Sequence, residues 1–330
     1  MRLKFLTSTF ALLCAMAVGH DVQAQMSVST NITSNTTWSG VVILETAIFV
    51  KNGATLTILP NTIVRGQPRT GPVLQGDPTG TPGALIVTQN GRIVADASAQ
   101  TSIIMTTAVV DNNNDGIADD LDGNGFLDPF PGFNPGTLTP STTPVFLDAT
   151  PRTAPLAPLD KAGNGNVSLW GGVVILGSAP TNLGSLSAGG YGQATVEGLT
   201  VPGFPVADAL YGGLEPHDNS GSLNFVSVRH AGDELGNGNE LNGVTLAGVG
   251  DGTRFQNVEV YCNFDDGIEW FGGTVNGKNL AVFFAGDDSF DLDEGYTGIN
   301  QFLFGIMPFF NDNFGGSFRS CRTAFSINSQ

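Results

Sequence analysis

Residues 257–270 read NVEVYCNFDDGIEW, and residues 279–292, 22 positions later, read NLAVFFAGDDSFDL. The two segments align without a gap, and their Asn-x-x-Val and Asp-Asp motifs fall at the same places. The same offset continues to residues 302–304, and a similar match starts at residues 242–246 with an offset of 24. Each unit alternates apolar residues in short runs separated by Gly, Asn and Asp, which is typical of strands and turns. This repeat decides the fold.

Three short strands and three turns fit into about 22 residues, and stacking such coils produces a solenoid. The chain is therefore predicted to be all-β, a right-handed parallel β-helix with about 22 residues per coil and inserted loops. A leucine-rich repeat has a similar length, but its leucine-asparagine signature is missing. Asn257 is expected to lie over Asn279 in an amide ladder at a turn. The positions expected to face the interior are Val258, Val260, Ile268, Leu280, Val282, Phe290, Phe302 and Phe304.

Composition supports a folded domain and excludes one class of partner. The 330 residues include 45 Gly and 22 Phe, and only 13% are charged, against about 25% in typical domains. The 13 basic and 30 acidic residues give a net charge of −17. Nucleic-acid binding needs clustered Lys and Arg, so it is excluded, whereas cations and neutral or basic partners are favoured.

The first 24 residues are predicted to be a signal peptide. Arg2 and Lys4 precede an apolar run from Phe5 to Val18, and Val22-Gln23-Ala24 provides a cleavage site after Ala24. The run is shorter than the ~20 residues of a membrane span. We therefore expect a secreted or cell-surface protein with no membrane span.

The remaining chain divides by its periodicity. Residues 25–305 are assigned to the β-helix, with Pro-, Gly- and Thr-rich loops at 67–83 and 129–166. The periodic pattern stops after Gly305, so residues 306–330 are predicted to be an irregular tail, and a truncated chain end is an open alternative.

Several segments resemble a family of secreted bacterial right-handed parallel β-helix proteins. The resemblance covers most of residues 36–305 and implies both the fold and export. It implies little about activity, because most members of that family have no assigned reaction. The segments that carry the resemblance are 38–66, 170–177 (WGGVVILG), 221–232 (GSLNFVSVRHAG), 240–261 and 265–298.

An acidic segment, residues 111–128 (DNNNDGIADDLDGNGFLD), has the ligand spacing of a calcium loop. Hard cations take six to eight oxygens, which alternate carboxylate and amide side chains, a glycine turn and one backbone carbonyl can supply. The segment resembles thrombospondin type 3 and dockerin-like repeats, and structural Ca²⁺ is predicted. A bidentate Glu is missing, so the expected dissociation constant is ~10⁻⁴ to 10⁻³ M. The alternative is an acidic loop that binds nothing tightly. The predicted ligands are Asp111, Asn113, Asp115, Ile117 through its carbonyl, Asp119, Asp120, Asp122, Asn124 and Asp128.

The repeat also predicts a strip of stacked carboxylates. The 22-residue offset places Asp265, Asp266 and Glu269 next to the equivalent Asp287, Asp288 and Asp291. Carboxylates this close cannot all ionise freely, so either some pKa values rise or a cation lies among them. Three interpretations stay open: backbone-capping turn residues, a cation site and a catalytic site.

The catalytic interpretation has a specific precedent. Residues 286–288 (GDD) are similar to a segment of pectin-degrading polysaccharide hydrolases, which use carboxylates on neighbouring β-helix coils. Their pattern continues with a His-Gly and an Arg-x-Lys, and neither follows Asp288. After the signal segment the histidines are His217 and His230, both upstream.

A polysaccharide lyase would instead combine calcium with a basic residue. The candidate bases are Arg229, Arg254 and Lys278, each of which is otherwise a solvated turn residue. Trp270 and Phe271 are candidates for stacking on a sugar ring, or for packing inside the coil.

These observations favour an extracellular or cell-surface binding or structural module that calcium stabilises, with carbohydrate binding or adhesion as its role. The expected partner is an extracellular polysaccharide or a cell-surface glycan. The alternative is a calcium-assisted polysaccharide lyase or glycoside hydrolase acting on an acidic glycan. Its catalytic candidates are the six carboxylates of the strip.

Overall fold

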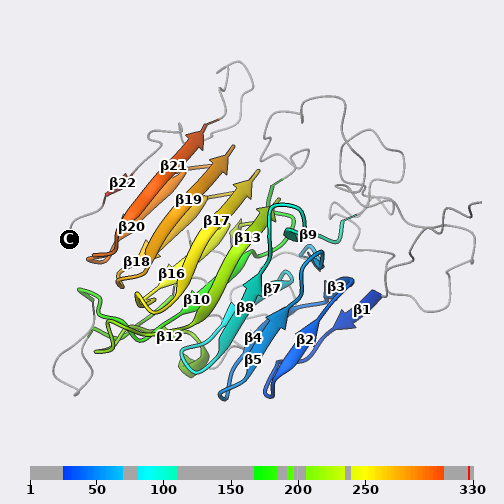
Figure 1. Ribbon diagram of the computed structural model, residues 1–330, viewed down its shortest axis with the longest axis horizontal. Helices are drawn as coiled ribbons and strands as arrows, with labels where there is room; N and C mark the ends of the chain where they lie inside the picture. Colours follow the sequence, from blue (N-terminus) through cyan, green and yellow to red (C-terminus); the bar gives the residue numbers. More distant parts are fainter. Residues whose placement is uncertain are drawn as a thin grey trace, which may run out of the picture.

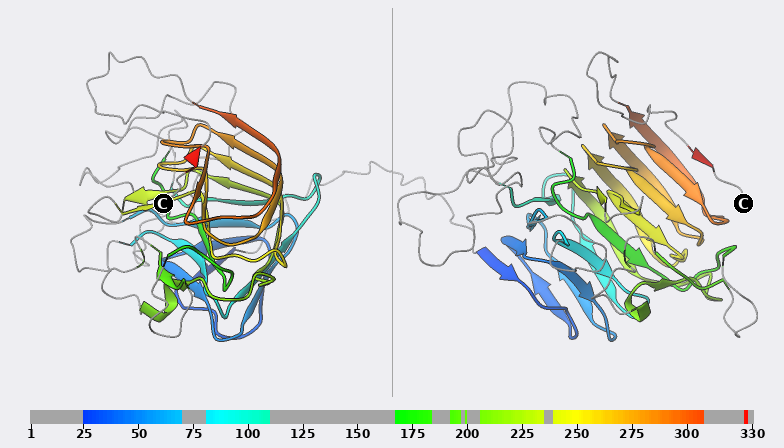
Figure 2. Two further views of the ribbon diagram at one scale, coloured as in Figure 1. Left: turned by 90° about the vertical axis from the view of Figure 1, so that its left-hand side faces the viewer. Right: turned by 180° about the vertical axis from the view of Figure 1, so that it is seen from behind.

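The strands of this protein wind into a right-handed parallel β-helix, so the predicted all-β fold is confirmed (Figures 1 and 2). The computed structural model describes residues 25–69, 81–109, 167–183, 192–196, 199, 206–234, 239–307 and 326–327. Within these ranges the single helical element is a three-residue 3-10 helix, η3 (Val206–Asp208). No helix in the described ranges is long and apolar enough to cross a membrane.

Most strands belong to two parallel sheets, called sheet A and sheet B here. In sheet A eleven strands pair, with β1-β3-β6-β9-β13-β17-β19-β21 as the main order. They are β1 (Gln25–Val28), β2 (Thr36–Trp38), β3 (Val41–Leu44), β5 (Thr55–Ile58), β6 (Ile63–Gly66), β8 (Arg92–Asp96), β9 (Ile103–Thr107), β13 (Gly221–Arg229), β17 (Arg254–Tyr261), β19 (Asn276–Phe283) and β21 (Asn300–Ile306).

Sheet B contains seven strands in the order β22-β20-β18-β16-β10-β7-β4. They are β4 (Ala47–Val50), β7 (Ala84–Val87), β10 (Val173–Leu176), β16 (Val244–Ala247), β18 (Ile268–Phe271), β20 (Phe290–Asp293) and β22 (Ser326–Ile327). Two short antiparallel pairs complete the described strands: β11 (Ala194–Thr195) with β12 (Leu210–Tyr211), and β14 (Asp233–Glu234) with β15 (Glu240–Leu241).

The predicted repeat is the physical coil. Val244 of β16 pairs with Ile268 of β18, and Ile268 pairs with Phe290 of β20, which reproduces the offsets of 24 and 22 residues. Each of these coils contributes a long strand to sheet A and a short strand to sheet B. Strands β17 and β19 bend where Asn257 and Asn279 adopt positive φ angles of 52° and 55°, so each coil has three straight runs.

The predicted amide ladder forms at this bend. Asn279 donates from Nδ2 to Oδ1 of Asn257 at 2.9 Å, and Asn257 donates to Oδ1 of Asn224 at 2.8 Å. Asparagine tolerates the left-handed conformation better than most residues do, which explains its use at this position. Asn279 is exposed, so the ladder runs along the surface.

The main core lies between the two sheets. It contains the inward-facing Val258, Val260 and Leu280 from sheet A, and the fully buried Trp270 and Phe290 from sheet B. Burying each large apolar side chain stabilises the fold by about 1.5–3 kcal/mol. The predicted inward positions up to Phe290 are therefore confirmed.

A second apolar layer covers the outer face of sheet B. Val174 and Phe271 point outward from the sheet, where Val196, Leu199 and Tyr211 pack against the same cluster. The rings of Tyr211 and Phe271 are 6.2 Å apart. Consequently this face of sheet B is closed by chain over part of its length.

The prediction was wrong for the last coil. Phe302 and Phe304 are 71% and 54% exposed, because Leu280 pairs with Leu303 and not with Phe302. The connection between β20 and β21 contains one residue more than the connection between β18 and β19. A shift of one residue moves every side chain of a strand to the opposite face.

The expected chain divisions are only partly visible. At the ends of the loop 67–83, Gly83 donates its backbone N–H to the carbonyl of Gln67 at 2.8 Å. In the tail 306–330, strand β22 pairs in parallel with β20. The signal segment 1–24 and the loop 129–166 lie outside the described residues.

Candidate functional site

The six predicted carboxylates lie together where sheet A turns into sheet B. Asp265 and Asp266 are in the turn between β17 and β18, and Asp287 and Asp288 are in the equivalent turn between β19 and β20. Glu269 on β18 pairs directly with Asp291 on β20. The stacking predicted from the 22-residue offset is therefore present.

A column of side-chain to backbone hydrogen bonds holds these turns together. Asn242 accepts from the backbone N–H of Asp266 at 3.2 Å, and Oδ1 of Asp266 accepts from the backbone N–H of Asp288 at 2.8 Å. Asn263 donates to the carbonyl of Asp266 at 2.5 Å. Each coil thus caps a backbone N–H group of the next coil.

The inner carboxylates of the strip are buried. Asp266, Glu269 and Asp291 are each less than a tenth exposed, and Asn242 donates to Oε2 of Glu269. Burial, followed by the negative charge of Asp265, raises the pKa of Asp266 well above its ordinary value. The protonated form of Asp266 is consequently favoured in the folded protein.

Two overlapping groups of these carboxylates bring their oxygens within 4.8 Å of one another. One group is Asp265, Asp266 and Asp287, and the other is Asp266, Glu269 and Asp291. Charges this close share a proton or need a neighbouring positive charge. Only the first group includes half-buried members, so only its side is open to solvent.

The candidate bases do not join the strip. Arg254 is the first residue of β17 and Lys278 lies near the start of β19, whereas the acidic turns follow the opposite ends of these strands. Arg229 lies closer to the turn, but it donates to the Ser227 hydroxyl at 2.9 Å and lies 3.9 Å from a Glu259 oxygen.

The histidines lie apart from the strip as well. The exposed His217 contacts Asp251 at 2.7 Å through Nδ1, and this hydrogen bond raises the pKa of His217 above its ordinary value. The buried His230 contacts the ring of Tyr261 edge-on at 5.9 Å between centroids.

The aromatic candidates are used for packing. Trp270 is fully buried and contacts Phe255 edge-on at 6.4 Å between centroids. Phe271 is 8% exposed and lies against Tyr211. The interpretation that Trp270 and Phe271 pack against the coils is therefore favoured over sugar stacking.

The predicted calcium ligands between Asp111 and Asp128 lie outside the described residues. Their assignment stays a prediction.

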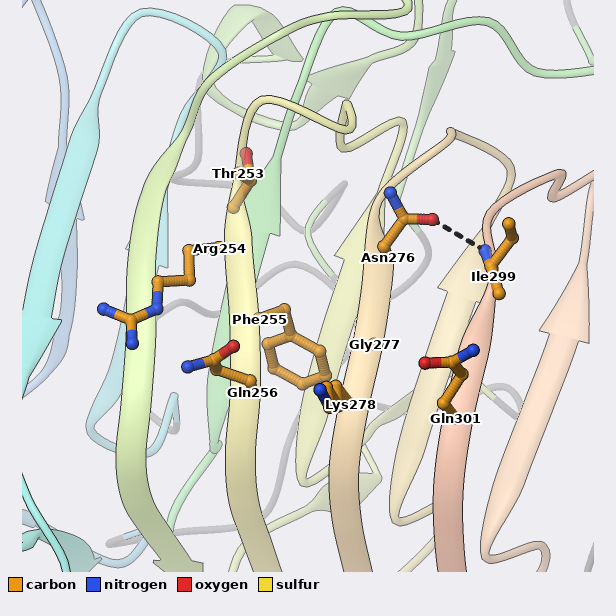
Figure 3. A pocket seen from close by; sticks show the side chains of 9 residues that line it. All are labelled: Thr253, Arg254, Phe255, Gln256, Asn276, Gly277, Lys278, Ile299 and Gln301. Carbon is orange, nitrogen blue, oxygen red and sulfur yellow. Dashed lines mark hydrogen bonds between the residues drawn. The ribbon is translucent and has the colours of Figure 1, made fainter.

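A groove that the sequence did not single out lies on the outer face of sheet A (Figure 3). It has a volume of about 400 Å³ and crosses the first residues of β17, β19 and β21. Its polar side chains come from Arg254, Gln256, Asn276, Lys278 and Gln301. In the sequence these residues look like solvated strand ends, and only the register between coils brings them into rows.

A comparison with known families matches residues 159–315 to a pectate-lyase-like beta-helix domain. The match covers just under half of the chain. Together with the two parallel sheets, it supports assignment to a parallel β-helix family. No curated protein and no solved structure matches the chain.

Proposed function

We propose that this protein is an exported binding and structural module that acts outside the cell or on its surface, with a polysaccharide as its partner. The match to a pectate-lyase-like domain supports a polysaccharide partner. The predicted signal peptide at residues 1–24 supports export. The long, regular outer faces of a solenoid suit extended ligands.

The observation that carries the proposal is the structural use of the acidic strip. Asp266 accepts the backbone N–H of Asp288, and Glu269 accepts from Asn242, so both carboxylates fix neighbouring coils to each other. A catalytic acid or base must instead reach a bound substrate. Three of the six carboxylates are too buried for that role.

We also propose that the segment 111–128 binds Ca²⁺ and that the ion orders this loop. The support is the spacing of its oxygen ligands, namely short carboxylate and amide side chains at alternate positions followed by glycine turns. Such a role would need only the millimolar affinity of extracellular calcium modules.

A calcium-assisted polysaccharide lyase or glycoside hydrolase is the second candidate. It is favoured by the cluster of Asp265, Asp266 and Asp287, which offers three oxygens on the more open side of the strip. A lyase also needs a base beside that cation. Arg254 and Lys278 lie at the opposite ends of their strands, which supports binding over turnover.

Turnover of an acidic glycan separates the two candidates. We would incubate the wild-type chain with polygalacturonate and calcium, and follow both unsaturated products and new reducing ends. The proposal predicts neither product and an unchanged polymer length. Activity that disappears in a folded Asp287→Asn variant, but persists in Glu215→Gln as an exposed-carboxylate control, would overturn it in favour of the enzyme.

A further inference from the structure

The groove on sheet A is built from two rows of outward-facing side chains. In the first row, Arg254 pairs with Asn276 across neighbouring strands. In the second row, Gln256 pairs with Lys278, and Lys278 pairs with Gln301. Neighbouring strands lie about 4.8 Å apart, so each row presents one side chain per coil at that spacing.

Arg254 is fixed and neutralised within the protein. Its Nη1 lies 2.7 Å from Oδ1 of Asp96. With its carboxamide oxygen turned toward the guanidinium, Gln256 accepts from Nη2 at 2.6 Å and from Nε at 3.0 Å. This orientation directs the NH₂ group of Gln256 away from Arg254, where it is free to donate to a ligand.

Lys278 differs from Arg254 in having no carboxylate within ion-pair distance among the described residues. It is exposed, and its Nζ lies 6.0 Å from the centre of the Phe302 ring. None of the nine described residues that line the groove is acidic, although the whole chain carries 30 acidic residues. The groove is thus a cationic, donor-rich area on an acidic protein.

We propose that this groove binds a polysaccharide that carries carboxylate groups, with Lys278 contacting a carboxylate and the amides of Gln256 and Gln301 donating to carboxylate or hydroxyl oxygens. Charge complementarity selects an anionic ligand, because all three side chains offer N–H donors. The row crosses three strands along an open sheet face, which fits an extended chain. The inference rests on the proposed polysaccharide partner and specifies both the polymer class and the face that binds it.

The site is separate from the acidic strip. Gln256 and Lys278 lie in the first half of their strands, and the turns with Asp265 and Asp287 come after the second half. Substituting the strip should therefore leave glycan binding unchanged.

The test is calorimetric titration of the full chain with a galacturonate hexamer and, as a neutral probe, a glucose hexamer. Wild type should bind the galacturonate hexamer, more weakly as salt increases, and the glucose hexamer at least tenfold more weakly. Lys278→Gln should lower the affinity about tenfold, which corresponds to one hydrogen bond to a charged group. Arg92→Gln, an equal charge loss at an exposed position on β8, should stay within twofold of wild type.

Each other outcome overturns the inference at a defined point. Equal losses in Lys278→Gln and Arg92→Gln would mean that binding follows net charge alone. Wild-type affinity in Lys278→Gln would place the glycan elsewhere and leave the proposed function intact. Equal affinity for both hexamers would refute the anionic class, and binding to neither would refute the proposed partner as well. Lys278 is exposed, so unchanged circular dichroism is expected to confirm that the variant folds.

Discussion

Replacing Asp266 separates its two effects, the hydrogen bond that it accepts and the charge that it buries. Asp266→Asn keeps an oxygen in place to accept the backbone N–H of Asp288, and removes the charge. Asp266→Ala removes both the acceptor and the charge. The difference between the two variants therefore isolates the hydrogen bond.

The expected magnitudes follow from burial and geometry. Leaving the backbone N–H of Asp288 without its acceptor costs about 1–3 kcal/mol, so Asp266→Ala should be less stable than Asp266→Asn by that amount. For a β-helix of this size, 1 kcal/mol corresponds to a shift of about 2 °C in the midpoint of thermal unfolding. The two midpoints should thus differ by about 2–6 °C.

The pH dependence has a definite sign. Burial and neighbouring carboxylates raise the pKa of Asp266 in the folded state above the unfolded value near 4. The folded state therefore binds this proton more tightly, so the stabilising contribution is present below pH 4 and is lost as the pH rises through the folded pKa. Relative to wild type, Asp266→Asn should gain stability from pH 4 to pH 8.

The assay is unfolding followed by circular dichroism at pH 4, 6 and 8, in the presence of a chelator. The reasoning is refuted if Asp266→Asn is as unstable as Asp266→Ala at pH 8. That result would mean that the native protein needs the negative charge itself, and a cation beside the strip would then be required.

Three further predictions test the packing and electrostatics of the coils. Gly286→Ala would place its Cβ 1.8 Å from the carbonyl oxygen of Phe264, so the variant should unfold at a clearly lower temperature than wild type in calorimetric scans. Phe290→Ala should cost about 3–5 kcal/mol in chemical denaturation, whereas Phe302→Ser should change stability by less than about 0.5 kcal/mol, because the first ring is buried and the second is exposed. Burial raises the pKa of Asp233 to about 6, so its stabilising contribution is lost as the pH rises from 4 to 6, by about 3 kcal/mol, and denaturation curves of Asp233→Asn should lack this change; a variant that follows the wild-type pH profile would contradict the assignment.

The repeat length predicted the register wherever the turns had equal length. The 22-residue offset correctly paired Ile268 with Phe290 and Glu269 with Asp291. It failed at Phe302 and Phe304 because an extra residue in one turn reverses the faces of the strand that follows it. A periodic pattern in sequence carries no warning of such an insertion when both faces contain apolar residues.

The candidate site was predicted in position but not in use. Nothing in the sequence distinguishes a carboxylate that caps a backbone N–H group, as Asp266 does, from one that faces a ligand. The groove was missed for a related reason, since Gln256, Lys278 and Gln301 are 22 and 23 residues apart and meet only through strand pairing. The calcium loop at 111–128 depends on sequence spacing alone and stays a prediction.

The central claim is that the acidic strip belongs to the turns of the β-helix and that calcium is bound by the loop 111–128. Calorimetric titration of calcium into the chain without its signal segment tests it directly, with Asp115→Ala and Asp287→Asn as the two variants. The account predicts that binding heat is lost in Asp115→Ala and retained in Asp287→Asn. Loss of a binding site in Asp287→Asn would place a cation in the strip and contradict the account.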